Sequence, residues 1–154
     1  MDQAKYYFLS GYTAKLAGTE IGVKEPQATF STCFGAAFMM RPAHEYGELL
    51  AGYVEKHNIN VWLVNTGWTA GPYGVGYRFP IRVTRSIIRL AQSGRLSECE
   101  FHNEPIFGLS IPTNVEGVDE ELLNPILTWD NKDAYTEAAV KLKGMFEENF
   151  KKYQ

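Results

Sequence analysis

A glycine-rich segment near the middle of the chain limits the folds that this sequence can adopt. Four glycines fall within the ten residues 67–76. Glycine reaches backbone conformations that other residues avoid, so a run of this kind forms a loop. The apolar, β-forming run 61–64 precedes this loop and predicts a buried strand. A helical pattern over residues 81–93 follows, so the sequence predicts a strand, a glycine loop and a helix in succession.

This order of elements is one in which phosphate groups are often bound. Residues 71–76 match the first six positions of a phosphate-binding loop, but Tyr77 and Arg78 stand where lysine and then serine or threonine are required. Without that lysine no side chain is placed to hold the terminal phosphates, and without the hydroxyl a Mg²⁺ ligand is missing. Spacing alone therefore leaves two interpretations open, a ligand-binding loop and an ordinary surface turn. Arg78 and Thr84 follow the loop and are candidates to face the same ligand.

Helical periodicity and turn residues predict the remaining elements. Residues 2–10 are expected to form a short helix ending at Gly11, and residues 42–57 and 131–152 longer ones. Residues 12–32 are expected to be loops with one strand at most, and residues 101–111 one or two strands interrupted by Pro105. In the helix over 81–93, four apolar side chains are expected to face the core: Ile81, Ile87, Ile88 and Ala91. Helices interleaved with strands indicate an α/β or mixed α+β fold.

Composition and charge exclude several classes of protein. A formal net charge of −3 on 154 residues argues against a nucleic-acid binder, which needs a surplus of lysine and arginine. An apolar content of 45% is typical of a folded domain, and no apolar run is long enough to cross a membrane. Cys33 and Cys99 lack paired spacing and are expected to be buried thiols in a cytoplasmic protein. No linker or repeat divides the chain, so residues 1–154 are expected to form a single unit.

Other candidate groups lack the spacing of a reactive or metal-binding site. His44, His57 and His102 show no ligand pattern with one another or with the cysteines, so structural or solvated roles are favoured for them. The acidic residues at 116 and 119–121 are typical of a solvated turn or of the first turn of a helix. From its residues alone, the chain is therefore a folded unit with one candidate ligand loop and an incomplete active site.

Several segments, taken together and in order, resemble one enzyme family. They are YFLSGYTAKLAGTE (7–20), FSTCFGAAF (30–38), LVNTGW (63–68), PYGVG (72–76), TR (84–85), IPT (111–113) and GVD (117–119). The set resembles the C-terminal portion of ATP-dependent phosphoenolpyruvate carboxykinases, and the resemblance extends from near residue 2 to the end. One departure is Arg41-Pro42-Ala43, where the family usually has His-Pro-Thr, and this change is expected to alter only the start of a helix.

The resemblance implies a reaction and a set of binding residues. Enzymes of this family, which are lyases of gluconeogenesis, convert oxaloacetate and ATP to phosphoenolpyruvate, CO₂ and ADP. By resemblance, Arg78 contacts the nucleotide electrostatically, Phe79 contacts the base or sugar, and Thr84 donates or accepts a hydrogen bond. Phe38 matches a phenylalanine that lines the oxaloacetate pocket, although a phenylalanine of the protein core explains it equally well.

The resemblance also implies what this chain lacks. In the family, the phosphate-loop lysine and threonine, the Mn²⁺ ligands and the oxaloacetate-binding arginine all precede the matching region, and the Mg²⁺ and Mn²⁺ of the full enzyme have no ligands here. The chain is therefore expected to be a C-terminal segment of the nucleotide-binding domain of a larger enzyme and to be inactive alone. Its expected partners are ATP, oxaloacetate or phosphoenolpyruvate and the rest of the parent chain. A non-catalytic nucleotide-binding or structural module is the alternative.

Overall fold

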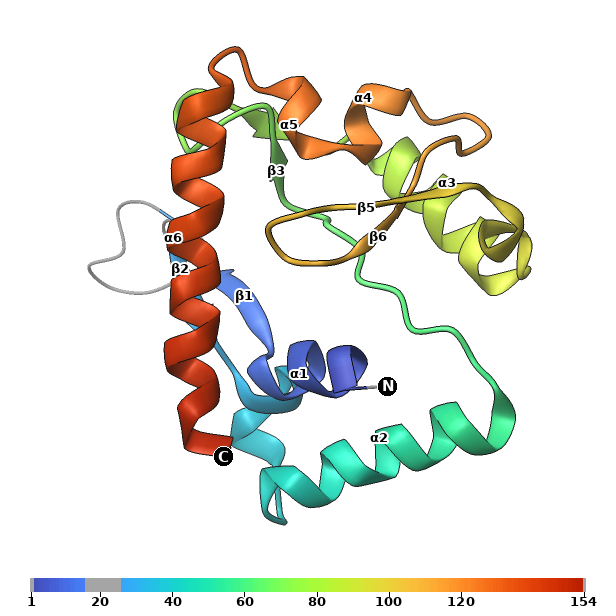
Figure 1. Ribbon diagram of the computed structural model, residues 1–154, viewed down its shortest axis with the longest axis vertical. Coiled ribbons are helices and arrows are strands. Elements are labelled where there is room, and N and C mark those ends of the chain that lie inside the picture. The colour runs from blue at the N-terminus through green and yellow to red at the C-terminus, as the bar shows by residue number, and fades with distance from the viewer. Residues whose placement is uncertain (1, 16–25, 154) are drawn as a thin grey trace. The chain divides into compact units, whose positions relative to one another are not determined.

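The computed structural model describes residues 2–15 and 26–153, and it combines helices with small antiparallel sheets (Figure 1). The mixed α+β class predicted from the sequence is confirmed. Two compact units can be recognised, one formed by Met1–Val61 with Gly144–Gln154 and the other by Trp62–Lys143. We describe each unit by itself.

The first unit contains two helices, a hairpin and several short helical turns. They are α1 (Asp2–Ser10), β1 (Tyr12–Lys15), β2 (Gln27–Phe30), η1 (Thr32–Phe34), η2 (Ala36–Phe38), α2 (Ala43–His57) and η4 (Lys151–Tyr153). The helices predicted over residues 2–10 and 42–57 are confirmed. The expectation of one strand at most within residues 12–32 is wrong, because β1 and β2 pair as an antiparallel hairpin with Tyr12 opposite Phe30. Part of the resembling segment 7–20 lies outside the described residues.

Gly11 makes the sharp joint between α1 and β1. Its φ angle is +55°, and its N–H donates to the carbonyl oxygen of Tyr7 at 3.0 Å, which closes the helix. Its own carbonyl accepts a hydrogen bond from the N–H of Ser31 at 2.9 Å. A Cβ atom at this position would lie 1.7 Å from the carbonyl oxygen of Ser31. Only glycine fits a left-handed joint packed this closely against the backbone.

Aromatic side chains from both ends of the sequence form the core of the first unit. The rings in mutual contact are Tyr6, Tyr7, Tyr12, Phe30, Phe146 and Phe150. Tyr153 adds polar contacts beside them, because its hydroxyl donates to the carbonyl oxygen of Leu9 at 2.8 Å and lies 2.6 Å from the hydroxyl of Thr32. Several of the residues that stabilise α1 therefore come from the last segment of the chain.

The second unit contains the glycine-rich segment. Its elements are β3 (Trp68–Thr69), β4 (Tyr77–Arg78), α3 (Ile81–Gln92), η3 (Arg95–Glu98), β5 (Phe101–Asn103), β6 (Ser110–Pro112), α4 (Glu120–Leu123) and α5 (Pro125–Thr128). The expectation of one or two strands within residues 101–111 is confirmed with two, because β5 and β6 pair antiparallel. Asp119 immediately precedes α4 and Glu120 and Glu121 lie in its first turn, so the start of a helix, one of the two interpretations of the acidic run, is confirmed. Val83, Leu96, Val115 and Val118 are the buried centre of the core.

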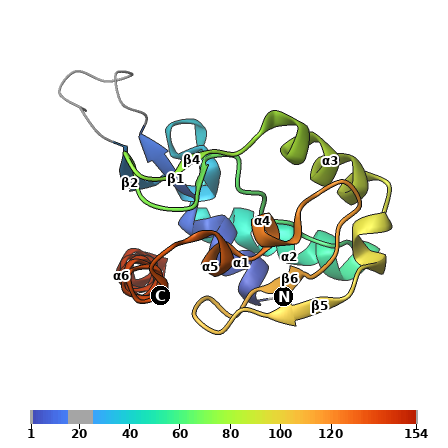
Figure 2. The same ribbon diagram turned by 90° about the horizontal axis from the view of Figure 1, so that it is seen from above.

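Helix α6 (Lys132–Phe150) begins in the second unit and ends in the first, and Figure 2 views it along its axis. The side-chain oxygen of Asn131 accepts hydrogen bonds from the N–H groups of Asp133 and Ala134, both at 3.0 Å, and so caps the first turn. The helix predicted over residues 131–152 is confirmed, and Tyr135, Ala139 and Phe146 form a buried apolar stripe along it.

Two predictions about buried apolar residues are wrong. In α3, Ile81 is 72% exposed and Ile88 is also exposed, whereas Val83, Ile87 and Leu90 face the core. Val83 and Leu90 are one heptad apart and lie on the side of the helix opposite Ile81 and Ile88. The helix therefore has two apolar stripes, and the one that contains Val83 and Leu90 faces the core. The run 61–64 belongs to none of the sheets, and its side chains are only partly buried.

Candidate functional site

The glycine-rich segment folds as a hairpin that leads directly into α3. Trp68 pairs with Arg78 and Thr69 with Tyr77 in an antiparallel ladder. At the tip, the N–H groups of Val75 and Gly76 both donate to the carbonyl oxygen of Pro72, at 3.1 and 2.9 Å. A Cβ atom on Gly76 would lie 2.3 Å from the carbonyl oxygen of Thr69, so the backbone closes on itself there. This closed turn replaces the open strand–loop–helix arrangement expected from the sequence.

Two polar side chains outside the hairpin hold it in place. The side chain of Asn65 donates to the carbonyl oxygen of Trp68 at 3.1 Å and accepts from the N–H of Gly67 at 2.8 Å. The hydroxyl of Thr128, in α5, accepts from the N–H of Ala70 at 3.2 Å and donates to the carbonyl oxygen of Pro125 at 2.8 Å. The sequence analysis missed both residues. An asparagine two residues before a glycine is a turn signal that identifies Asn65, whereas Thr128 has no local signal.

Arg78 ends the hairpin with an exposed side chain. Among the residues that the structure describes, its guanidinium has no salt-bridge partner. By contrast, Arg95 of the same unit pairs with Glu116. A guanidinium without an internal partner on a fixed backbone can bind phosphate oxygens through two parallel hydrogen bonds.

Phe79 and Thr84 lie on either side of the start of α3. The N–H of Phe79 donates to the carbonyl oxygen of Gly67 at 2.9 Å, and its half-buried ring packs against the core of the second unit. Thr84 is half-buried in the first turn of the helix, where its N–H donates to the carbonyl oxygen of Pro80 at 3.3 Å. The structure therefore places Arg78 and Phe79 immediately before the helix that carries Thr84.

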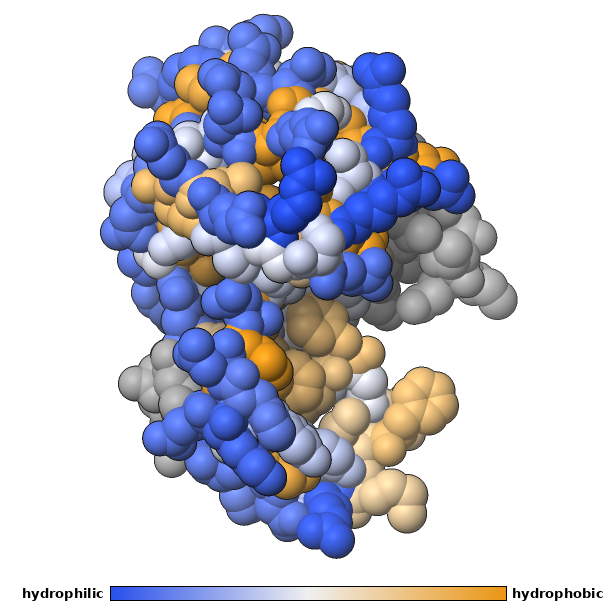
Figure 3. All heavy atoms as spheres, turned by 90° about the vertical axis from the view of Figure 1, so that its right-hand side faces the viewer, coloured by the Kyte–Doolittle hydropathy of each residue, from blue (hydrophilic) through white to orange (hydrophobic). Residues whose placement is uncertain are grey.

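Phe38 belongs to the first unit and stands apart from its core. Its side chain is 85% exposed at the end of η2, so its interpretation as a phenylalanine of the core is wrong for this structure. The turn before it contains two consecutive left-handed residues that are not glycine, Cys33 with φ of +53° and Phe34 with φ of +59°. Figure 3 shows orange, hydrophobic residues at the molecular surface among blue, hydrophilic ones.

The titratable groups that the structure describes are spread over both units, and no three His, Cys, Asp or Glu side chains among them come together. His44 and His57 are exposed and His102 is half-buried. Cys33 is buried and Cys99 half-buried, both as free thiols, and burial raises the pKa of the Cys33 thiol. A hydrogen bond from Lys5, followed by its positive charge, lowers the pKa of Glu48.

A metal site does not fit the described part of the chain. In residues 2–15 and 26–153, no three His, Cys, Asp or Glu side chains come together in a group that could hold an ion. Within the same ranges, no helix combines the length and the apolar character needed to cross a membrane.

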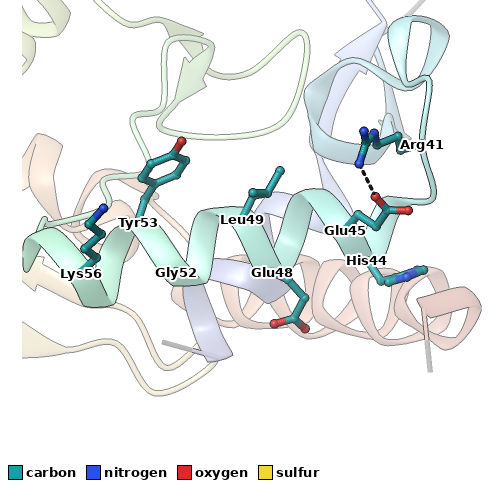
Figure 4. A pocket seen from close by; sticks show the side chains of 8 residues that line it. All are labelled: Arg41, His44, Glu45, Glu48, Leu49, Gly52, Tyr53 and Lys56. Atoms are coloured by element: carbon teal, nitrogen blue, oxygen red, sulfur yellow. Dashed lines mark hydrogen bonds and ion pairs between the residues drawn. The ribbon is translucent and has the colours of Figure 1, made fainter.

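A shallow hollow of about 530 Å³ lies along one side of α2 (Figure 4). Most of the side chains that line it are charged or polar, and the lining residues are Arg41, His44, Glu45, Glu48, Leu49, Gly52, Tyr53 and Lys56. Arg41 donates to Glu45 at 3.0 Å, so the departure Arg41-Pro42-Ala43 adds an ion pair at the start of this helix. None of the residues that we assigned to ligand binding lies in this hollow.

Comparisons with known proteins agree with the family resemblance that the segments of the sequence carry. The family model described as phosphoenolpyruvate carboxykinase matches residues 1–121. The chain is 56% identical over 153 residues to phosphoenolpyruvate carboxykinase (ATP) of Rhizobium etli and 53% identical over 152 residues to that of Thermus thermophilus. Each match covers 99% of this chain but only 28% and 29% of the relative, in its C-terminal part. The chain therefore belongs to the ATP-dependent phosphoenolpyruvate carboxykinase family.

Proposed function

We propose that this chain supplies the C-terminal segment of a larger ATP-dependent phosphoenolpyruvate carboxykinase and contributes part of its ATP site. The complete enzyme would act in the cytoplasm, in gluconeogenesis, with both units belonging to its nucleotide-binding domain. The observation that carries the proposal is the position of Arg78. Its guanidinium makes no salt bridge within the described residues and lies at the end of the β3–β4 hairpin. Nearly the whole chain matches enzymes named as ATP-dependent.

The proposed reaction separates into two steps whose charges must be stabilised. Loss of CO₂ from oxaloacetate leaves the electrons of the broken C–C bond in an enolate. The enolate oxygen then attacks the γ-phosphorus of ATP, and the bond to ADP breaks. Negative charge on the transferring phosphoryl group is stabilised by cations and by hydrogen-bond donors fixed in advance. Divalent metal ions, bound by the rest of the enzyme, would supply much of that positive charge.

Within this scheme the described residues bind and orient the nucleotide. Arg78 is placed to neutralise phosphate charge, because its side chain is exposed and makes no salt bridge within the described residues. Phe79 is held by the carbonyl of Gly67 and can form one wall beside the base or sugar. Thr84 offers a hydroxyl from the first turn of α3. Phe38, on its exposed turn, is proposed to complete the pocket for oxaloacetate or phosphoenolpyruvate.

A chimaeric enzyme tests this proposal. The region of the R. etli carboxykinase that matches this chain is replaced by residues 1–154, and formation of phosphoenolpyruvate from oxaloacetate and ATP is measured with Mn²⁺. We expect turnover by the chimaera and none by the isolated chain. In the chimaera, Arg78→Ala should raise the KM for ATP roughly 10- to 100-fold, as expected from losing charge-assisted hydrogen bonds of about 1.5–3 kcal/mol. Arg89→Ala, at another exposed arginine of the second unit, is the matched control.

The outcomes separate this proposal from the alternative module. A chimaera that folds and binds ATP without turnover would favour a non-catalytic nucleotide-binding or structural segment. Equal effects of Arg78→Ala and Arg89→Ala on the KM for ATP would exclude a specific role for Arg78. Turnover by the isolated chain would refute the dependence on the rest of the enzyme.

A further inference from the structure

The β3–β4 hairpin that carries Arg78 has a very short ladder to hold it in register. The ladder consists of two residue pairs, Trp68 with Arg78 and Thr69 with Tyr77. An isolated two-stranded hairpin is at best marginally stable in water, so one this short depends on contacts from other elements. Register also sets the direction of the side chains, because a slip of one residue turns every side chain of a strand to the other face. The contacts that fix this register therefore decide on which face Arg78 lies.

Thr128 makes such a contact beside the second pair of the ladder, and Figure 1 shows its helix, α5, close to β3. The hydroxyl oxygen of Thr69 and the backbone nitrogen of Ala70 both lie 3.2 Å from the hydroxyl oxygen of Thr128. Thr128 donates its own proton to the carbonyl oxygen of Pro125 at 2.8 Å, so Thr69 is the donor in the pair of hydroxyls. A hydroxyl has one proton and two acceptor positions, and Thr128 uses all three.

The backbone of Ala70 shows why the hairpin needs this hydroxyl. Its φ angle is +62°, and Gly71 follows with φ of +144°. A left-handed residue other than glycine persists only where its surroundings impose that conformation. Thr69 beside it is only 6% exposed, so its hydroxyl has little access to water and needs a partner within the protein. Thr128 supplies the acceptor for both groups.

The helix α5 is itself fixed where it presents Thr128. The ammonium group of Lys132 donates to three carbonyl oxygens around the end of α5, those of Ile126, Leu127 and Trp129, at 2.7, 3.0 and 2.6 Å. The ring of Trp129 packs edge-to-face on the ring of Tyr135, with their centroids 5.7 Å apart. Because Lys132 and Tyr135 belong to the first turns of α6, the hydroxyl of Thr128 is presented by an element tied to that long helix.

We propose that Thr128 is a positioning residue of the nucleotide site, whose hydroxyl fixes the end of β3 and thereby the register that sets the face of Arg78. The proposal rests on the proposed function, since it takes Arg78 to bind the phosphates of ATP. Phe79 has a separate anchor, because its N–H donates to the carbonyl oxygen of Gly67. Loss of the Thr128 hydroxyl therefore acts on the nucleotide through Arg78.

Steady-state kinetics of the R. etli chimaera test this role. Thr128→Val keeps the shape of the side chain and removes three hydrogen bonds, so it should raise the KM for ATP roughly 5- to 30-fold. The KM for oxaloacetate should change by less than about 2-fold, because only nucleotide binding is altered. Thr128→Ser restores the hydroxyl and should behave like the unsubstituted chimaera. Thr136→Val, which removes a hydroxyl bonded to a backbone carbonyl of α6, is the matched control.

A double substitution tests whether Thr128 acts through Arg78. Once Arg78 is replaced by alanine, the register of the hairpin no longer affects a contact with phosphate. In the Arg78→Ala chimaera, Thr128→Val should therefore raise the KM for ATP by less than about 2-fold more. If the effects of the two substitutions multiply instead, Thr128 acts on another group and the proposal is wrong.

Hydrogen exchange measured by mass spectrometry follows the hairpin without relying on turnover. We expect the amides between residues 69 and 78 to exchange at least about 10-fold faster in the Thr128→Val chimaera than in the Thr128→Ser chimaera. Equal exchange in the two variants would show that the hydroxyl does not hold the hairpin, and would overturn the proposal.

Calorimetric titration with ATP keeps this proposal separable from the proposed function. A chimaera that binds ATP without turnover, and binds it more weakly with Thr128→Val than with Thr128→Ser, would support the role of Thr128 and count against the catalytic proposal. Turnover with the same KM for ATP in both variants would refute the role of Thr128 and leave the proposed function standing.

Discussion

The buried carboxylate of Glu104 offers a sharp test of how the second unit is stabilised. Glu104 follows β5 and is only 6% exposed. One carboxylate oxygen accepts the N–H of Ile106 at 3.0 Å, and the other accepts the N–H of Phe107 at 2.6 Å. Both donors belong to the turn that connects β5 to β6. The side chain therefore accepts hydrogen bonds from two backbone N–H groups of this turn.

Glu104→Gln keeps the size of the side chain and removes one acceptor. The amide oxygen can still bind one N–H, but the amide NH₂ then faces the other backbone donor. Hydrogen bonds to charged groups contribute about 1.5–3 kcal/mol each, and an unsatisfied buried donor costs about 1–3 kcal/mol. These terms overlap, so we expect the free energy of unfolding to fall by about 2–3 kcal/mol. With a urea dependence of about 2 kcal/mol per molar, the midpoint should fall by roughly 1 M or slightly more.

Urea unfolding followed by circular dichroism measures this change, and Glu98→Gln is the matched control. Glu98 is an exposed carboxylate of the same unit, and its substitution should change stability by less than about 0.5 kcal/mol. Tyr135 provides a second measurement. Burial, and then the charge of Glu104, raises its pKa, so Glu104→Gln should lower the pKa of Tyr135 while burial still keeps it above 10.0. Equal midpoints for the two variants would refute the reasoning.

Two further predictions concern alkaline pH and helix α6. Burial raises the pKa values of Tyr6 and Tyr12 above 10.0, so the unfolded chain releases these protons first. The stabilisation that these two tyrosines contribute is complete below pH 10.0 and is lost as the pH rises through their pKa values in the folded chain. The urea midpoint of unfolding should therefore fall as the pH is raised above 10.0, and it should fall less steeply for Tyr12→Phe. A Cβ atom on Gly144 would meet nothing within 4 Å, so Gly144→Ala should raise the free energy of unfolding by about 0.5–1 kcal/mol. Gly47→Ala, whose Cβ would lie 3.1 Å from the side chain of Lys5, should gain less, and equal gains in thermal unfolding would contradict this account.

The helices were predictable because their information is local, whereas several strands were not. Gly11, the acidic run before α4 and the stripe of α6 are signals contained within one or two turns. The hairpin β1–β2 was missed because its strands, YTAK and QATF, alternate weakly in hydrophobicity. The run 61–64 was predicted as a buried strand from its composition, but composition cannot say whether a partner strand is present.

The candidate site shows the same division between local and distant information. Spacing alone left the glycine loop open to two interpretations. The roles proposed for Arg78, Phe79 and Thr84 came from the resemblance of several segments to the carboxykinase family. The hydrogen bond between Ala70 and Thr128 joins residues 58 positions apart, and no local sequence pattern predicts it. The exposure of Phe38 was equally unpredictable, because a phenylalanine between apolar neighbours is usually buried.

The core of the first unit contains residues that are synthesised at different times. α1 leaves the ribosome well before the rings of Phe146 and Phe150 and the hydroxyl of Tyr153, which contact it, are made. At about 5–20 residues per second, synthesis leaves the aromatic side of α1 uncovered for roughly 10–30 s. A nascent chain that stalls before residue 146 exposes the faces of Tyr6 and Tyr7 that Phe146 covers, and we expect such a chain to bind chaperones.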